Sequence, residues 1–276
     1  MFVSSLHTYP VKGCYRLDHD VVAVEPWGFA GDRRWLITDP DHHFVSQREE
    51  ARLALVRPSL TMDGLVLDAP GMESIEVPHP IGGELAAVTV WKSTFDAALA
   101  DKSASGWLSD FLGRDLRLFW LDDPTRRASN PAFSEPGDRV SFADGYPVLL
   151  ASVSSLAQLN DWIAQDFPDD AALLGPLPMT RFRPNVVISG GPAWAEDGFT
   201  GRRVRIGGTT FRVPKPCGRC VVTTIDQESA ERTRQPLRTL AKYRHLNSDL
   251  VFATNLIPDD PQAAAVISLG DPVVLA

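Results

Sequence analysis

The residues of this sequence best suited to chemistry are two cysteines, Cys217 and Cys220, which stand two residues apart. A pair with this spacing can complete a zinc site, cycle between thiol and disulfide, or give one thiolate to another metal centre. A structural zinc site usually has a second close pair of ligands. The third cysteine, Cys14, lies near the N-terminus, and no second pair of this kind occurs, so zinc is the less favoured role.

The residues around the pair bear on whether it acts in redox chemistry, packs in a core or binds a different metal. The run Val-Val-Thr-Thr-Ile after Cys220 resists helix formation and predicts a strand, so a thiol activated by a helix N-terminus is not expected. Cysteines can also pack as small hydrophobic side chains. The segment Pro214–Arg219 is stiff and basic, and such a loop suits a metal or an anionic cofactor better than a core.

Basic residues elsewhere in the chain also suit an anionic cofactor. Arginine guanidinium groups and backbone amides are the groups that hold a buried phosphate. Any one such residue alone would be taken as a solvated surface charge. The candidates, each beside a turn or just before an apolar run, are Lys12, Arg33, Arg34, Arg181 and Arg183, with Asn185 nearby.

Length, charge and cysteine count exclude several classes of function. The 276 residues carry a formal charge of −8, which disfavours binding to nucleic acid or to an anionic membrane. No apolar run reaches the ~18 residues needed to span a bilayer, and no signal peptide is recognised at the N-terminus. Three cysteines do not make a disulfide framework, so a reducing cytoplasm is predicted.

The patterns along the chain predict a mainly β, α+β fold with one or two barrels. Hairpins are expected around Asp63-Gly64 and Gly207-Gly208, and a strand pair around residues 39–41. Apolar spacing predicts helices over 103–113 and 151–167, and a third after Pro236. Further strands are expected over 183–191, 220–226 and 268–276. The polar, proline-rich segment 120–140 predicts a linker or a long loop.

Four segments together carry a family resemblance: YPVKG, GDRRW, FRPNVVISG and CGRCVVTTID. In this order they resemble the MOSC-domain molybdenum proteins, above all the amidoxime-reducing components and their bacterial counterparts. The resemblance implies an N-terminal β-barrel module over residues 1–115 and a MOSC β-barrel domain over residues 116–276.

The resemblance also implies a cofactor, molybdopterin carrying one molybdenum (Moco). Cys220 matches the position of the protein thiolate that binds the metal, whereas Cys217 matches a position that is not a ligand. Asp144 lies beside the expected metal face and is assigned to proton movement. The other positions that match cofactor contacts are Lys12, Gly13, Arg33, Gly145, Tyr146, Arg183, Asn185, Gly218, Arg219 and Asn255. The sequence departs from the family pattern at Gly145 and Tyr146, where backbone contacts are expected, and at Asn255, where some relatives have tyrosine.

The function implied by the resemblance is a molybdenum-dependent oxidoreductase, independent of pyridoxal phosphate. It would reduce small N-hydroxylated compounds such as amidoximes, hydroxylamines and N-hydroxylated bases. No iron–sulfur cysteine pattern is present, so electrons are expected from a separate protein: a ferredoxin, a cytochrome b5-like protein or a flavin reductase. Two different functions remain open: a cofactor carrier or sulfur-transfer module, and a non-catalytic barrel whose cysteines pack or bind zinc.

Overall fold

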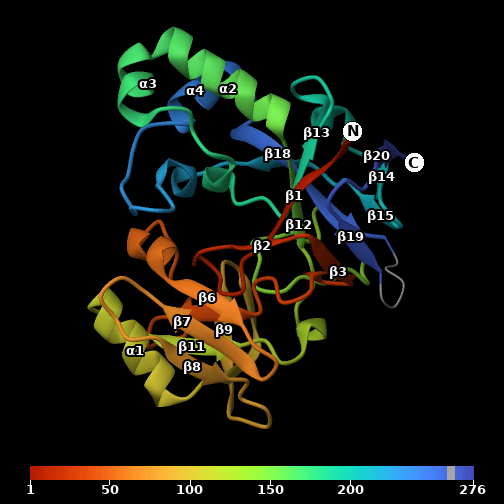
Figure 1. The fold of residues 1–276 in the computed structure, drawn as a ribbon. Helices are drawn as coiled ribbons and strands as arrows, with labels where there is room; N and C mark the ends of the chain where they lie inside the picture. Colours follow the sequence, from red (N-terminus) through yellow and green to blue (C-terminus); the bar gives the residue numbers. More distant parts are fainter. Residues whose placement is uncertain (260–264) are drawn as a thin grey trace.

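The computed structural model describes residues 1–259 and 265–276. Figure 1 shows two parts, one above the other. The upper part carries three helices, α2 (Val153–Asp166), α3 (Pro168–Leu174) and α4 (Leu237–Tyr243). The lower part carries α1 (Lys102–Leu112) beside several short strands. Short 3-10 turns connect the elements: η1 (Ala51–Leu55), η2 (Pro124–Arg126), η3 (Met179–Phe182), η4 (Ala195–Phe199) and η5 (Val221–Thr224).

The largest sheet in the described part of the chain joins the two ends of the sequence. Its order is β2 (Leu17–His19), β1 (Phe2–Thr8), β13 (Val186–Ser189), β12 (Val148–Ser152), β18 (Asp249–Pro258), β15 (Thr209–Arg212), β14 (Arg203–Ile206) and β20 (Val273–Leu275), and β16 (Pro216–Gly218) and β17 (His245–Leu246) also pair with β18. The β12–β13 pair is parallel. Because β1 pairs with β13, the first strand belongs to the same sheet as strands from the second half of the chain.

Three smaller sheets complete the β structure of the described residues. They are β5 (Trp35–Thr38), β11 (Arg117–Trp120), β10 (Ser93–Leu99) and β9 (Leu85–Val90); then β6 (Arg57–Leu60), β7 (Gly64–Asp68) and β8 (Ile75–Pro78); and β19 (Val266–Ser268), β3 (Val21–Glu25) and β4 (Gly28–Phe29). The apolar face of α1 packs with β5, β7, β8 and β11 in a buried core that includes Trp35, Ile37, Leu108 and Leu118. A separate core contains residues of the large sheet and of the β19–β3–β4 sheet.

Local signals explain the main helices. Gly113 ends α1 in the left-handed conformation, with a φ of 68°, which glycine adopts without steric cost. Ser152 begins α2, and its hydroxyl accepts a hydrogen bond from the backbone N–H of Ser155, as expected of a helix N-cap. Leu159 and Ile163 of α2 are buried in a third core against β18.

Most of the fold expected from the sequence is confirmed. The chain is mainly β with a few helices, and the hairpins around residues 61–64 and 207–208 form. The long connection between β11 and β12 contains only the short turn η2. Within the described residues, no helix is long and apolar enough to cross a membrane. The division at residue 115 stays a prediction.

Two expectations are wrong. Residues 220–226 were expected as a strand, but η5 occupies most of this segment and the neighbouring strand is β16. In the expected strand pair around residues 39–41, only β5 forms a strand, and the residues after the turn make isolated bridges such as Thr38 to Phe44. Strand β5 pairs with β11 instead, so a strand distant in sequence replaces the local partner.

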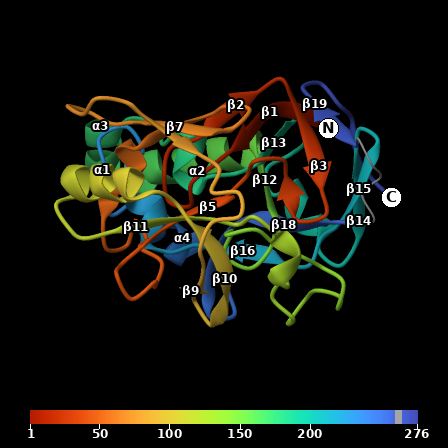
Figure 2. The same cartoon turned by 90° about the horizontal axis from the view of Figure 1, so that it is seen from below.

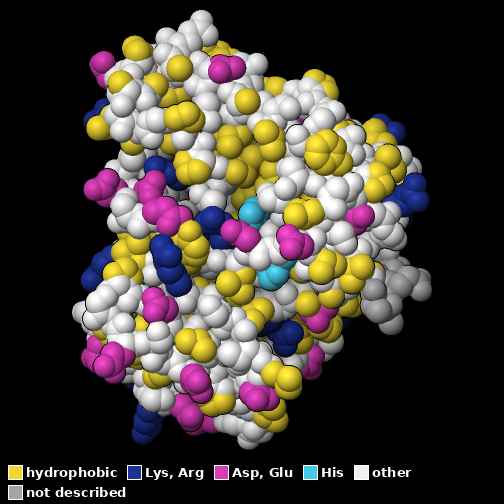
Figure 3. Space-filling view, in the orientation of Figure 1, with side chains coloured by type: hydrophobic (Ala, Val, Ile, Leu, Met, Phe, Trp, Pro, Cys, Tyr) yellow, Lys and Arg dark blue, Asp and Glu magenta, His cyan; other side chains and the backbone are white. Residues whose placement is uncertain are grey.

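Charged side chains connect the two parts of the molecule. Figure 3 shows basic, acidic and histidine side chains gathered between the upper and lower parts on this face. Arg57 of β6 and Arg16 both contact the Glu228 carboxylate, at 3.2 and 3.7 Å. Seen from below, the β9–β10 hairpin and β16 come to the same side of the molecule (Figure 2), where residues from both regions line one pocket.

Candidate functional site

A single pocket collects every residue that the family resemblance assigns to the site, whereas Arg34 and Arg181, also expected as phosphate-holding candidates, are not among the residues that line it. The residues that line it include Lys12, Gly13, Arg33, Asp144, Gly145, Tyr146, Arg183, Asn185, Cys217, Gly218, Arg219, Cys220 and Asn255. They come from the turn after β1, the segment before β5, the loop before β12, the η3–β13 connection, β16 with the residues after it, and β18. Folding therefore brings these segments together, while the role of each residue stays a prediction.

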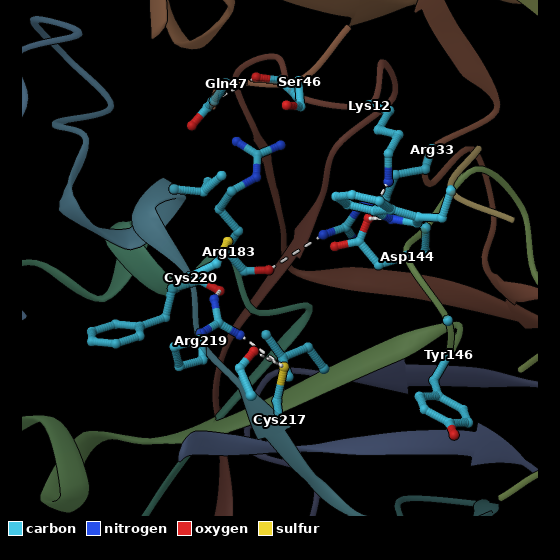
Figure 4. Close-up of a pocket in the computed structure, with 18 of the residues that line it drawn as sticks. Lys12, Arg33, Ser46, Gln47, Asp144, Tyr146, Arg183, Cys217, Arg219 and Cys220 are labelled. Carbon is cyan, nitrogen blue, oxygen red and sulfur yellow. Dashed lines mark hydrogen bonds and ion pairs between the residues drawn. The ribbon is translucent and has the colours of Figure 1, made fainter. Parts of the chain in front are cut away.

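The two cysteines lie on one loop and have different surroundings (Figure 4). Arg219 Nη1 donates a hydrogen bond of 2.9 Å to Cys217 Sγ, and Arg219 Nη2 donates one of 2.8 Å to the carbonyl of Phe182. Cys220 is a free, half-buried thiol directly before η5. The arginine thus holds the first sulfur, and the second lies at the wall of the pocket.

Side-chain hydroxyls explain why a turn replaces the expected strand after Cys220. Thr223 Oγ1 donates to the Cys220 carbonyl at 2.9 Å, and Thr224 Oγ1 donates to the Val221 carbonyl at 2.7 Å. Buried Arg181 donates to the Thr224 carbonyl at 2.8 Å. These bonds satisfy the carbonyls that a sheet partner would otherwise satisfy, and so they override the strand propensity of the segment.

Two arginines meet over one buried aromatic ring. The guanidinium groups of Arg33 and Arg183 each lie 4.2 Å from the ring centre of Tyr9. Arg33 Nη1 contacts the Asp32 carboxylate at 2.6 Å, and Arg183 Nη1 donates to Gln227 Oε1 at 2.9 Å. Burial lowers the pKa of Arg183 to about 10, which leaves it charged at neutral pH. The two cations share one nearby carboxylate, so this side of the pocket is suited to an anion.

The side chains of Asn185 and Asn255 form hydrogen bonds to other groups of the protein. Asn185 Oδ1 accepts from Arg33 Nη1 at 3.0 Å and from the Leu149 backbone N–H at 3.1 Å, while its Nδ2 donates to the His7 carbonyl at 3.1 Å. Asn255 Nδ2 donates to the Lys215 carbonyl at 3.3 Å. These contacts position Arg33 and the β16 loop.

Lys12, Asp144 and Trp91 form a second polar group in the pocket. Asp144 Oδ1 accepts from Lys12 Nζ at 2.5 Å and from Trp91 Nε1 at 3.0 Å. The side chain of Lys12 is 11% exposed and that of Asp144 is 73% exposed. Burial lowers the pKa of Lys12. Desolvation within the pocket opposes ionisation of Asp144, but the charge and the hydrogen bond of Lys12 outweigh it and hold the carboxyl pKa below its usual value.

A buried arginine supports the loop that carries Asp144. Arg127 is 4% exposed; its Nη1 donates to the Ala143 carbonyl at 2.6 Å and its Nη2 to the Asp144 carbonyl at 3.0 Å. Tyr146, further along this loop, points away from Lys12 and Asp144 (Figure 4). Its hydroxyl is buried and has no hydrogen-bond partner among the described residues, and burial raises its pKa.

Several pocket residues were missed by the sequence reasoning. They are Phe44, Ser46, Gln47, Arg48 and Trp91, all from the first part of the chain. Buried Gln47 and Gln227 exchange hydrogen bonds of 3.1 Å between their side-chain amides. No spacing signal connects two glutamines so far apart. Trp91 offered a weak signal, because it is an aromatic residue at a turn between two strands.

Comparison with known families identifies the class of protein. The MOSC N-terminal beta barrel domain matches residues 1–115, and the MOSC domain matches residues 137–274. The chain therefore belongs to the MOSC domain family. Among the described residues, no group of three or more His, Cys, Asp or Glu is placed to hold a metal ion.

Individual relatives within the family fall into two kinds. The chain is 31% identical to Mitochondrial amidoxime reducing component 2 of Bos taurus, over 88% of this chain and 72% of that protein. It is 28% identical to Mitochondrial amidoxime-reducing component 1 of Homo sapiens, over 99% of this chain and 82% of that protein. It is also 28% identical to Molybdenum cofactor sulfurase of Homo sapiens, over 88% of this chain but only 28% of that protein.

Proposed function

We propose that this chain is a molybdenum cofactor-dependent oxidoreductase that reduces small N-hydroxylated compounds. The observation that carries the proposal is the pairing, in one pocket, of a free thiol with a buried cationic cluster. The similarity to amidoxime-reducing components over nearly the whole chain supports the same activity.

The donor set of the pocket fits a metal that arrives with an organic, phosphorylated ligand. Cys220 supplies one soft thiolate, which suits a transition metal. Arg33 and Arg183 would hold the phosphate, because guanidinium groups bind its oxygens through paired hydrogen bonds. The buried Arg219 Nε and Tyr146 hydroxyl lack hydrogen-bond partners in the described part of the chain, and an incoming polar group would satisfy such atoms. Gly13, Gly145 and Gly218 also line the pocket.

When bound, the molybdenum cofactor would supply the two electrons of the reduction and the capacity to take up oxygen. The protein must then supply protons and hold the substrate. Lys12 Nζ donates a hydrogen bond of 2.5 Å to Asp144 Oδ1, and burial lowers the pKa of Lys12, which makes it a stronger acid. Lys12 holds the pKa of the exposed Asp144 carboxyl below its usual value, so this carboxylate stays ionised and orients the ammonium group. We infer that this pair delivers protons to the departing oxygen.

Electrons would come from a separate protein, such as a ferredoxin, a cytochrome b5-like protein or a flavin reductase. We also propose that residues 1–115 and 116–276 form the two functional modules, since the pocket takes residues from both. Small amidoximes, hydroxylamines and N-hydroxylated bases are the proposed substrates.

A carrier or sulfur-transfer role is the second candidate. It is favoured by the similarity to Molybdenum cofactor sulfurase and by Cys217, whose sulfur accepts a hydrogen bond from Arg219. A carrier would bind the pterin and release or modify it, without turnover of an N-hydroxylated substrate.

Metal and pterin analysis tests both candidates on protein from a host that makes molybdopterin. We expect about one molybdenum and one pterin per chain, with the metal lost in Cys220→Ala and retained in Cys217→Ala. Reduction of an amidoxime with a chemical or protein electron donor would then follow metal content. Bound pterin without amidoxime turnover favours the carrier. Zinc alone, or neither metal nor pterin, refutes the cofactor-dependent function.

A further inference from the structure

The turn between β9 and β10 holds an aromatic residue in a position that usually belongs to glycine. Val90 pairs with Ser93, so Trp91 and Lys92 alone form the turn. Trp91 has a φ of 56°, a region that bulky residues rarely adopt. Tight two-residue turns with positive φ at the first position favour glycine there. The strained backbone therefore calls for a reason to keep an indole at this point.

The surroundings of Trp91 direct it to the pocket rather than to a core. The residue is 43% exposed and lines the pocket. Its Nε1 donates to Asp144 Oδ1 at 3.0 Å, which fixes the plane of the ring. Phe44 meets the indole edge-on with ring centres 4.7 Å apart, and the Arg48 guanidinium lies 4.5 Å from the ring centre.

The pocket consequently has two unlike walls. One wall carries Arg183 and the segment from Cys217 to Cys220, all from the second half of the chain. The other wall, here called the aromatic wall, consists of Phe44, Arg48 and Trp91. Asp144 lies beside Trp91, its Oδ1 at 3.0 Å from the indole Nε1, with a carboxylate that is 73% exposed and held ionised by Lys12. A ligand resting on the indole would meet a hydrogen-bond acceptor at the edge of the ring.

We propose that Trp91 is a specificity-determining residue, whose indole receives a flat conjugated substrate while Asp144 accepts a hydrogen bond from that substrate's N–H group. The proposal rests on the reductase function proposed above. Stacking contributes before and during the reaction alike, so it strengthens binding and lowers KM without changing kcat.

Two amidoximes that differ only in the ring provide the test. Benzamidoxime and acetamidoxime share the same N–OH and NH2 groups, but only the first has a surface that stacks on an indole. We expect the cofactor-loaded protein to bind benzamidoxime about tenfold more tightly by calorimetry, as one stacking contact allows. In Trp91→Leu this preference should disappear. In Trp91→Phe, which keeps a ring and loses the N–H donor, the preference should remain. Lys92→Ala, in the same turn, is the matched control.

The outcomes separate this proposal from the reductase function. A preference for benzamidoxime that vanishes in Trp91→Leu and persists in Trp91→Phe supports the proposed role of Trp91. If this binding pattern is found but neither amidoxime is reduced, only the reductase function is refuted. Equal binding of the two amidoximes by the unaltered protein overturns the proposal, as does a preference that survives in Trp91→Leu. Loss of affinity for both amidoximes to the same extent, with molybdenum content retained, also overturns it, because that result marks Trp91 as structural support.

Discussion

Gln47 and Gln227 form a buried pair between the two halves of the chain, so we expect the effects of their substitutions on stability to be strongly coupled. The two side chains are 2% and 4% exposed and exchange hydrogen bonds of 3.1 Å. Gln47 Nε2 also donates to the Gly13 carbonyl at 2.6 Å, and Gln227 Oε1 accepts from Arg183 Nη1 at 2.9 Å. The pair thus connects the Lys12–Gly13 turn to a cation of the pocket.

Replacement by methionine keeps the length of each side chain and removes its polar atoms. In Gln227→Met, Gln47 Oε1, Arg183 Nη1 and the Ile225 carbonyl each lose a hydrogen bond, and an unsatisfied buried group costs about 1–3 kcal/mol. We therefore expect a loss of about 3 kcal/mol in the free energy of unfolding for Gln227→Met, and about 2 kcal/mol for Gln47→Met, which leaves the Arg183 contact in place. The double variant should lose about 1 kcal/mol less stability than the sum of the two single variants. In the double variant both amides are absent, so neither is left without its hydrogen-bond partner.

Urea unfolding followed by circular dichroism measures all three free energies. Gln165→Met, at an exposed position of α2, is the matched control and should change stability by less than about 0.5 kcal/mol. Additive effects of the two single variants, within about 0.5 kcal/mol, would refute the reasoning, as would a Gln227→Met variant as stable as the control.

Three further predictions concern stability and thiol reactivity. Burial raises the pKa of Glu196, so the folded state binds the proton more tightly than the unfolded state. The free energy of unfolding should therefore fall as pH rises above the unfolded pKa of about 4.3, and Glu196→Gln should reduce this slope in urea melts from pH 4 to 8. Burial raises the pKa of Cys14 to about 12. A thiol reagent at pH 8 should therefore label Cys217 and Cys220 in the native protein, and Cys14 only after unfolding. Rapid labelling of Cys14 in the native protein would contradict this prediction. A Cβ at Gly64 would lie 2.0 Å from the Val77 carbonyl oxygen, whereas one at Gly106 of α1 meets no atom within 4 Å. In thermal unfolding, Gly64→Ala should therefore be less stable than the unaltered protein by at least about 1–3 kcal/mol. Gly106→Ala should be more stable by about 0.5–1 kcal/mol. Stability changes of the same sign in both variants would be incompatible with this packing.

The Gly64 turn illustrates how a prediction can be right for an incomplete reason. The Asp63-Gly64 pair predicted a hairpin through its tolerance of positive φ, and the hairpin of β6 and β7 forms. Gly64, however, is not among the residues with positive φ. It is needed because the backbone of β8 passes too close for any side chain, and that constraint depends on a third strand that the local sequence does not contain.

The resemblance to the MOSC family predicted which residues gather in the pocket, but it did not predict how they contact one another. Lys12 is expected to hold the cofactor, and the structure adds its ion pair with Asp144. Asn185 is expected to contact the cofactor, and the structure adds its hydrogen bonds to Arg33 and to the backbone. Motif residues are recognised by position, whereas their hydrogen-bond partners come from other segments.

The sequence by itself determined the mainly β class, helices α1 and α2, and the hairpin of β14 and β15. These features depend on caps, turn glycines and apolar spacing, which act over a few neighbouring residues. Only the tertiary structure decided that η5 replaces a strand, that Gln47 meets Gln227, and that Trp91 faces Asp144. Each of these involves a contact between distant segments, such as that of Arg181 with the Thr224 carbonyl of η5, and the local sequence does not contain the partner.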